Sequence, residues 1–267
     1  MSEPTADRRP RDPQRPTRLT PEEYLRCWDD DLAALLATTT ADPATAVPSC
    51  PGWTLADLWT HVGEVYAHKA AAIRGGAPPD PWPPARGEDV DPVASLRDSA
   101  ADLRGLLAGA DPSAPAWSWW PPEQTLGFWQ RRMAHETAVH RWDAELAVGT
   151  PAPIEPALAV DGCDELLGWL TWAWDELPQP EAAGQVVVVR TDGAGWRVRL
   201  EPTVVSVDLD DDDDELGVDA VVAGPPSDLL LHLWGRVPGA VADGLVSEDG
   251  DPLARALLRA RLAMTTD

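Results

Sequence analysis

The chain has 267 residues, of which 44% are hydrophobic and 25% are charged, and its formal net charge at pH 7 is −24. This length allows one large domain or two modest ones. The charge argues against binding to nucleic acid, whose phosphates require Lys and Arg, and against anionic membrane surfaces. Because the sequence also has no apolar run long enough to span a membrane and no secretory signal, we expect a cytoplasmic protein.

The first predicted feature is a tail followed by a helix. Residues 1–18 contain five arginines and four prolines with almost nothing apolar, so we expect them to be disordered. Thr20 then has the features of a helix N-cap, because Pro21 occupies the first helical position and Glu23 the capping-box position. The spacing of the apolar residues that follow predicts a helix.

Three more helices are predicted in the first half of the chain. Thr54 and Asp57 form a second capping box, and Gly75 and Gly76 are expected to end that helix. A third helix is predicted to open at Asp91 and Pro92, and a fourth covers about 126–148. These segments predict a four-helix bundle over residues 19–152.

The pattern changes after residue 152, where short apolar runs alternate with helical segments. We predict helices at 157–176, 226–234 and 251–263, and strands at 186–190, 196–200, 203–207 and 218–223. The acidic run 210–215 is interpreted as a solvated hairpin tip. The chain is therefore predicted to be an α+β protein, with a second and smaller α+β domain over residues 153–267.

Three cysteines, Cys27, Cys50 and Cys163, are widely separated and lack any C-x-x-C spacing. This arrangement predicts neither a disulfide framework nor a cysteine zinc site. We expect buried free thiols.

The fourth helix carries the pattern with the most chemical content. Glu136 and His140 are four residues apart, so their side chains point the same way from successive turns and can hold one divalent metal with a third ligand. His135 lies on the opposite side of that helix and is expected to be packed or exposed. The alternative is a set of hydrogen-bonded, buried residues without a metal.

The third ligand must come from a facing helix of the bundle. His61 is the best candidate, because it shares an inward stripe with Leu58 and Val62 of the second helix. His68 is two turns further along the same face, about 10 Å away, so the two histidines cannot share one metal. Asp57 is interpreted as a helix cap.

Two separated motifs resemble a known family. P-G-W-T-x-A-D-L-x-x-H over 51–61 and R-M-A-H-E-T-A-V-H-R-x-D over 132–143 resemble the N-terminal domain of the mycothiol-dependent maleylpyruvate isomerase family, which belongs to the DinB-like metal-binding four-helix bundles. G-P-P-S-D-L-L-L-H-L-W-G-R over 224–236 resembles the C-terminal α/β domain of that family. The resemblance covers nearly all of the chain after the tail.

The resemblance implies a set of functional residues. It places the zinc ligands of the family on His61, Glu136 and His140, and an arginine near the active site on Arg236, where it could hold a substrate carboxylate. Arg236 could equally be a surface residue at a helix end. Arg141 and Asp143 either orient the ligands or form structural salt bridges.

The resemblance also implies a reaction. The expected cofactors are a divalent metal, most simply zinc although iron or nickel would suit the same ligands, and mycothiol as thiol cosubstrate. A metal-activated mycothiol thiolate would add to a small electrophile such as maleylpyruvate, the resulting single bond would rotate, and elimination would give the trans isomer. Related members are expected to transfer the thiol onto other electrophiles.

Two other functions stay open on the sequence. One is a metal-dependent hydrolase in which Glu136 is a ligand. The other is a non-catalytic binding or regulatory protein, whose ligand pocket Trp117, Trp119 and Trp120 could line if they are not core or loop anchors. For each of these functions we expect a monomer or a homodimer. The expected partners of the isomerase or transferase are a small-molecule substrate and a low-molecular-weight thiol.

Overall fold

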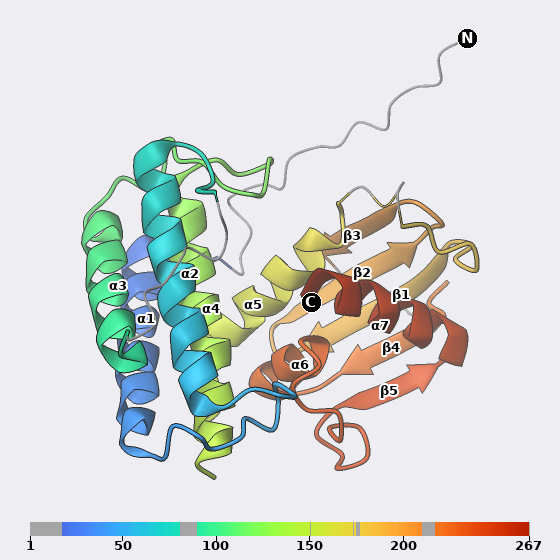
Figure 1. The fold of residues 1–267 in the computed structure, drawn as a ribbon. Coiled ribbons are helices and arrows are strands. Elements are labelled where there is room, and N and C mark those ends of the chain that lie inside the picture. Colours follow the sequence, from blue (N-terminus) through green and yellow to red (C-terminus); the bar gives the residue numbers. More distant parts are fainter. Residues whose placement is uncertain are drawn as a thin grey trace.

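The computed structural model describes residues 18–80, 90–149, 151–172, 174, 177–209 and 217–266. Residues 1–17 of the predicted tail and the acidic run 210–215 lie outside the described residues. The chain forms a helical part followed by a part that contains a sheet (Figure 1). This confirms the predicted α+β class, with a helical bundle first and an α+β unit after it.

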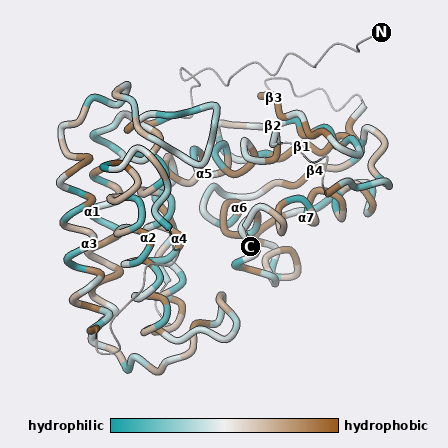
Figure 2. Tube along the Cα trace, turned by 45° about the horizontal axis from the view of Figure 1, so that its top comes forward, coloured by the Kyte–Doolittle hydropathy of each residue, from teal (hydrophilic) through white to brown (hydrophobic). Residues whose placement is uncertain are grey.

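Four helices make up the bundle. They are α1 (Pro21–Ala37), α2 (Leu55–Gly75), α3 (Pro92–Leu107) and α4 (Leu126–Ala147), with a 3-10 turn, Thr38–Thr40, after α1. Helix α1 packs on α4, and α2 packs on α3. Hydrophilic and hydrophobic residues alternate along α1 and α3 (Figure 2), as expected for helices with one buried face. In the described ranges, no helix is long and apolar enough to cross a membrane.

The predicted N-caps of α1 and α2 and the predicted end of α2 are confirmed. Thr20 and Thr54 cap α1 and α2, each with a complete capping box. Helix α2 ends where Gly76 adopts a left-handed conformation with φ 67°. Gly63 lets α2 approach α3 closely, because a Cβ there would lie 3.1 Å from the Cα of Leu96.

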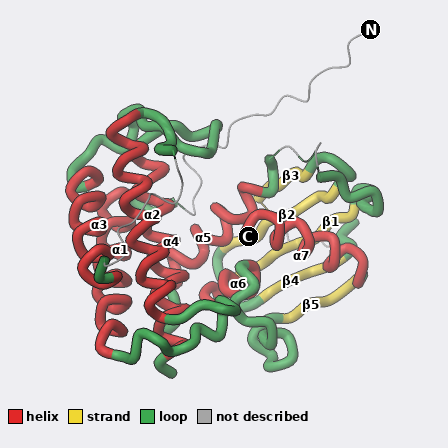
Figure 3. The backbone as a smooth tube through the Cα atoms, in the orientation of Figure 1, coloured by secondary structure: helices red, strands yellow, loops and turns green. Residues whose placement is uncertain are grey.

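The second part combines three helices with a five-stranded sheet (Figure 3). Its elements are α5 (Pro156–Trp169), β1 (Gln185–Thr191), β2 (Ala194–Leu200), β3 (Val205–Leu209), β4 (Ala220–Ala223), α6 (Pro226–Leu233), β5 (Ser247–Gly250) and α7 (Pro252–Thr266). The strand order is β3-β2-β1-β4-β5, and only the β1–β4 pair is parallel. Helix α7 packs on β1, β2 and β4, and α5 packs on β2, so both helices cover the sheet.

Several predicted elements differ from the structure. Strand β2 begins at Ala194 instead of 196, β4 begins at Ala220 instead of 218, and α7 ends at Thr266 instead of 263. Helix α5 ends at Trp169 instead of 176, because the next residues form tight i to i+3 turns and the Thr171 hydroxyl bonds to the Gly168 carbonyl. The third strand begins at Val205, two residues later than predicted. Strand β5 was not predicted, since its sequence Ser-Glu-Asp-Gly is polar and its pairing with β4 gives no local signal.

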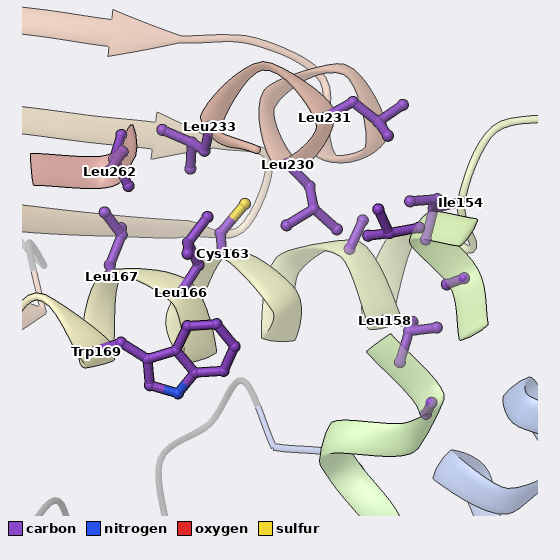
Figure 4. Close-up of a cluster of buried hydrophobic side chains, with 14 of the residues drawn as sticks. Ile154, Leu158, Cys163, Leu166, Leu167, Trp169, Leu230, Leu231, Leu233 and Leu262 are labelled. Atoms are coloured by element: carbon purple, nitrogen blue, oxygen red, sulfur yellow. The ribbon is translucent and has the colours of Figure 1, made fainter. Parts of the chain in front are cut away.

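A cluster of buried aliphatic side chains holds α5, α6 and α7 together (Figure 4). Cys163, Leu166 and Leu167 of α5 lie opposite Leu230 and Leu233 of α6 and Leu262 of α7, and all six are buried. The three cysteines are buried and free, as predicted.

Helix α4 is enclosed between the bundle and α5. Every residue from 128 to 144 is buried except Glu136, which is partly buried. Arg131 of α4 forms a bidentate ion pair with Asp161 of α5, with both N···O distances 2.9 Å. Asp161 also accepts from the Tyr24 hydroxyl at 2.7 Å and contacts His135 Nε2 at 2.9 Å. All four side chains are buried. Together they form a polar junction that connects α1 and α4 of the bundle to α5.

Candidate metal centre

His61 of α2 and Glu136 and His140 of α4 converge on one point. One ligand atom from each lies within 4.8 Å of the others. Glu136 Oε1 is 3.6 Å from His61 Nε2 and 3.3 Å from His140 Nε2. Ligands bonded at about 2.1 Å to one tetrahedral ion are about 3.4 Å apart, so the two distances from Glu136 are compatible with a shared divalent metal. Two imidazoles and one carboxylate are also a donor set that zinc accepts.

Asp143 orients His140 within this cluster. Its carboxylate lies 3.0 Å from His140 Nδ1, which leaves Nε2 directed at Glu136. Asp143 is fully buried and also accepts from the Ser49 hydroxyl at 2.6 Å. A carboxylate on the outer nitrogen of a histidine is the common support for a metal ligand, because it fixes the tautomer and the ring orientation.

Arg132 holds the second oxygen of Glu136. Its Nη2 donates to Glu136 Oε2 at 2.6 Å, while its Nη1 donates to Glu165 of α5. The guanidinium also lies over the rings of Trp169 and Trp234, at 5.0 and 5.7 Å from their centroids. These contacts come from the second part of the chain and position the Arg132 side chain beside Glu136.

The charges at the cluster are strongly coupled. Burial alone would raise the pKa of Glu136, but His140, His61 and Arg132 hold it well below its usual range. Burial alone would lower the pKa of His140, but the Glu136 and Asp143 carboxylates raise it to about 9. In the metal-free protein His140 is therefore protonated at neutral pH, and a metal must displace that proton.

The other predicted histidines lie outside the cluster. His135 is buried and contacts Asp161, on the opposite side of α4. His68 is buried, with Nδ1 3.2 Å from the amino group of Lys69, and does not join the ligand group. Of the two candidates on α2, the structure therefore brings His61 to Glu136. Asp57 caps α2, as predicted.

Arg236 follows α6 and reaches the edge of the cluster. Its Nε lies 3.2 Å from Asp143 Oδ1, so it is connected to His140 through one carboxylate. Its terminal nitrogens make no hydrogen bond to the described part of the chain, which leaves them available to an anion. Arg141 instead forms ion pairs with Asp31 and Glu145. Of its two predicted roles, these contacts fit the structural salt bridge.

The loop tryptophans have no ring contact with the three candidate ligands in the described part of the chain. The Trp119 ring contacts Trp120, Phe128 and Trp169, at centroid distances of 6.1, 5.5 and 5.0 Å. Trp120 lines a cavity of about 550 Å³ between α1, α4 and α5. Trp117 accepts a hydrogen bond on its carbonyl from Trp129. These contacts anchor the loop before α4.

Sequence reasoning missed three residues around the cluster. Trp53, whose ring centroid is 5.0 Å from that of His61, covers one ligand. Ser49 and Arg132 support Asp143 and Glu136. A signal existed only for Arg132, because it precedes Glu136 by four residues on one helix and an i, i+4 pair of opposite charges is expected to meet.

The fold and this cluster define a four-helix bundle with a two-histidine, one-glutamate group, of which His140 is buried and His61 and Glu136 are partly buried, joined to an α+β unit. Residues 25–145 match the family profile described as the mycothiol maleylpyruvate isomerase N-terminal domain, and residues 157–256 match its MDMPI C-terminal domain. The chain belongs to the mycothiol-dependent maleylpyruvate isomerase family. No curated protein matches its sequence.

Two solved structures share the fold. One is of the mycothiol-dependent maleylpyruvate isomerase, with 15% sequence identity and a TM-score of 0.56. The other is of a histidine-to-alanine mutant of the mycothiol-dependent maleylpyruvate isomerase, with 13% identity and a TM-score of 0.57. Each similarity covers 87% of this chain and 95% of the other. The likeness extends over both parts of the fold.

Proposed function

We propose that this chain is a mycothiol-dependent isomerase or S-transferase that uses a divalent metal, most simply zinc, held by His61, Glu136 and His140. The observation that carries the proposal is the convergence of these three ligand atoms in a member of this family. A metal bound there would lower the pKa of a thiol and supply it as a thiolate at neutral pH. The electrophile would be a small molecule such as maleylpyruvate.

The surrounding side chains would prepare the reaction in three ways. With a metal in place, Asp143 would hold His140 in the tautomer that presents Nε2. His140, His61 and Arg132 keep Glu136 ionised, with Oε1 facing both histidines. Trp53 packs against the ring of His61, whose side chain stays 33% exposed, so a substrate could reach this side of the site. Arg236 would bind a carboxylate of the electrophile through its terminal nitrogens while Nε stays on Asp143.

The nucleophile is expected to come from outside the protein. Burial is the main reason that the pKa values of Cys27 and Cys50 are raised to about 11 and that the pKa of Cys163 is also raised. Such thiols carry almost no thiolate at neutral pH.

A variant with Cys27, Cys50 and Cys163 all replaced by alanine should therefore keep its activity and still require added mycothiol. The measurement is the rate of loss of the electrophile with and without the thiol. The single replacement Cys50→Ala is the matched control for local damage, because Cys50 lies 3.6 Å from Asp143. A folded and metal-loaded triple variant that is inactive would point to a protein thiol as nucleophile.

Replacing Arg236 by alanine should weaken binding of a carboxylate-bearing substrate by about 1.5–3 kcal/mol, the scale of a hydrogen bond to a charged group. Metal content should stay unchanged, because Arg236 contacts no ligand atom directly. Titration of substrate into the variant measures the loss, and Arg141→Ala serves as a control at a second arginine near the site. Unchanged kinetics in Arg236→Ala would assign that arginine to the protein surface.

One experiment tests the function as a whole. Elemental analysis of the purified protein is followed by a thiol-consumption assay with mycothiol and a panel of small electrophiles that includes maleylpyruvate. Metal at one ion per chain together with thiol-dependent turnover supports the proposal. Metal-dependent hydrolysis without thiol consumption would favour a hydrolase, and absence of metal and turnover would favour a binding protein.

A further inference from the structure

A second cavity lies beside Arg236, where the bundle meets the sheet-containing part. Its volume is about 590 Å³, within the range of pockets that bind small organic molecules. Ser49 and Pro51, from the loop before α2, form one wall, and the ends of α6 and α7 form the others. None of the three candidate metal ligands lines it.

Positive charge is concentrated in this cavity. Acidic residues outnumber Lys and Arg by 45 to 21 in the whole sequence, yet Arg236, Arg255 and Arg259 line the cavity with Glu248 as its one carboxylate. Arg255 and Arg259 are four residues apart on α7 and so share one face of the helix. These three arginines favour an anion in this cavity, although the net charge of the protein is −24.

One carboxylate cannot saturate these donors. Glu248 Oε2 is 2.9 Å from Arg259 Nη2 and 3.5 Å from Arg255 Nη1, and its Oε1 is 3.0 Å from His232 Nε2. Arg255 Nη1 also donates to the Glu248 carbonyl at 2.9 Å, and the Arg259 side chain is 64% exposed. Two guanidinium charges therefore meet one carboxylate, and Arg255 Nε is a buried donor without an acceptor among the described residues.

Apolar side chains line a further part of the cavity, beside the polar groups of Ser49, His232 and Thr266. Leu258 and Leu262 of α7, Leu233 of α6 and Val241 line it together with the arginines. A ligand that fits both surfaces carries a negative charge at one end and a short hydrocarbon body at the other.

We propose that this cavity is an anion-binding site, separate from the metal centre, that accepts the carboxylate of a small organic acid on Arg255 and Arg259 and its hydrocarbon body on the leucines of α6 and α7. Arg236 stands between the two sites, since it lines the cavity and also contacts Asp143. The alternative is that the arginines and Glu248 only hold α7 to β5 and α6.

Binding of hexanoate to the full-length, metal-loaded protein, measured by calorimetry, tests the proposal. Hexanoate should bind, whereas hexanol and hexylammonium of the same chain length should not. The double variant Arg255→Gln/Arg259→Gln should bind hexanoate at least about tenfold more weakly, as expected for lost hydrogen bonds to a charged group. Arg26→Gln, which removes an exposed arginine on α1, should bind it as the parent does.

Two further variants distinguish a binding cavity from arginines that serve only to hold α7 in place. Val241→Trp adds bulk at the exposed rim of the cavity without removing a charge, and it should weaken binding even if the arginine variant folds poorly. His61→Ala removes a candidate metal ligand and should leave hexanoate binding intact. Equal binding of hexylammonium, unchanged affinity in the arginine and Val241 variants, or loss of binding in His61→Ala would each overturn the proposal.

Discussion

Replacing His140 with alanine is expected to abolish stoichiometric metal binding. The variant would lose one of three ligand atoms and would leave the Glu136 and Asp143 carboxylates without the imidazole between them. Two ligands from a bundle core do not hold zinc against competing chelators, because a protein site of this type uses three protein ligands and one open position. Elemental analysis after dialysis against a mild chelator measures the effect.

Two control variants locate the metal. His135→Ala and His68→Ala remove buried histidines of the same bundle that do not belong to the ligand group, so both should retain one metal per chain. Loss of metal in either control, or full metal content in His140→Ala, would contradict the proposed ligand set.

Replacing Asp161 with alanine should destabilise the protein by about 3–5 kcal/mol, the cost of leaving a buried charge without its partner. Arg131 would lose its bidentate ion pair and keep Asp164, at 3.2 Å, and the backbone carbonyl of residue 161, at 3.0 Å, while both Tyr24 and His135 would lose their contact with the Asp161 carboxylate. Urea unfolding followed by circular dichroism gives the change in the free energy of unfolding. A change below about 1 kcal/mol, the scale of exposed ion pairs, would contradict the assigned role of this junction.

The pH dependence of stability gives a second measure of Asp161. Burial alone would raise its pKa, but Arg131 and His135 hold it well below the usual range. A carboxyl group with a lowered pKa in the folded state contributes fully to stability above its unfolded-state pKa of about 4, and this contribution is lost as the pH falls. Acid should therefore destabilise the parent more steeply than Asp161→Asn. The double variant Arg131→Met/Asp161→Leu, which removes both charges, should be less unstable than Asp161→Ala.

Local sequence patterns predicted much of the fold and the centre of the candidate site. The capping boxes at Thr20 and Thr54 and the terminal Gly76 depend only on residues close in sequence, so the helix limits followed directly from them. The Glu136 and His140 pair was equally local, because helical periodicity alone places both on one face.

Features that depend on distant residues could not be predicted in this way. The contacts of Arg132 with Glu165, Trp169 and Trp234 join three helices, and no spacing along the chain indicates them. Strand β5 exists because β4 supplies its hydrogen bonds, although its own residues are polar. The cavity beside Arg236 combines a loop of the bundle with α6 and α7, which meet only in the folded chain.

The enclosure of α4 leads us to expect that the two parts of this molecule unfold as one cooperative unit. A helix with charged residues all around it, including Arg131 and Arg132, tolerates burial only because α5 and α6 supply the opposite charges and the aromatic faces. Cut away from the sheet-containing part, the bundle would expose one side of α4 and leave both arginines without their α5 carboxylates. The boundary between the two family profiles therefore marks a change of architecture along the chain. We expect no separate unfolding transition on either side of it, because unfolding of one part removes contacts that support the other.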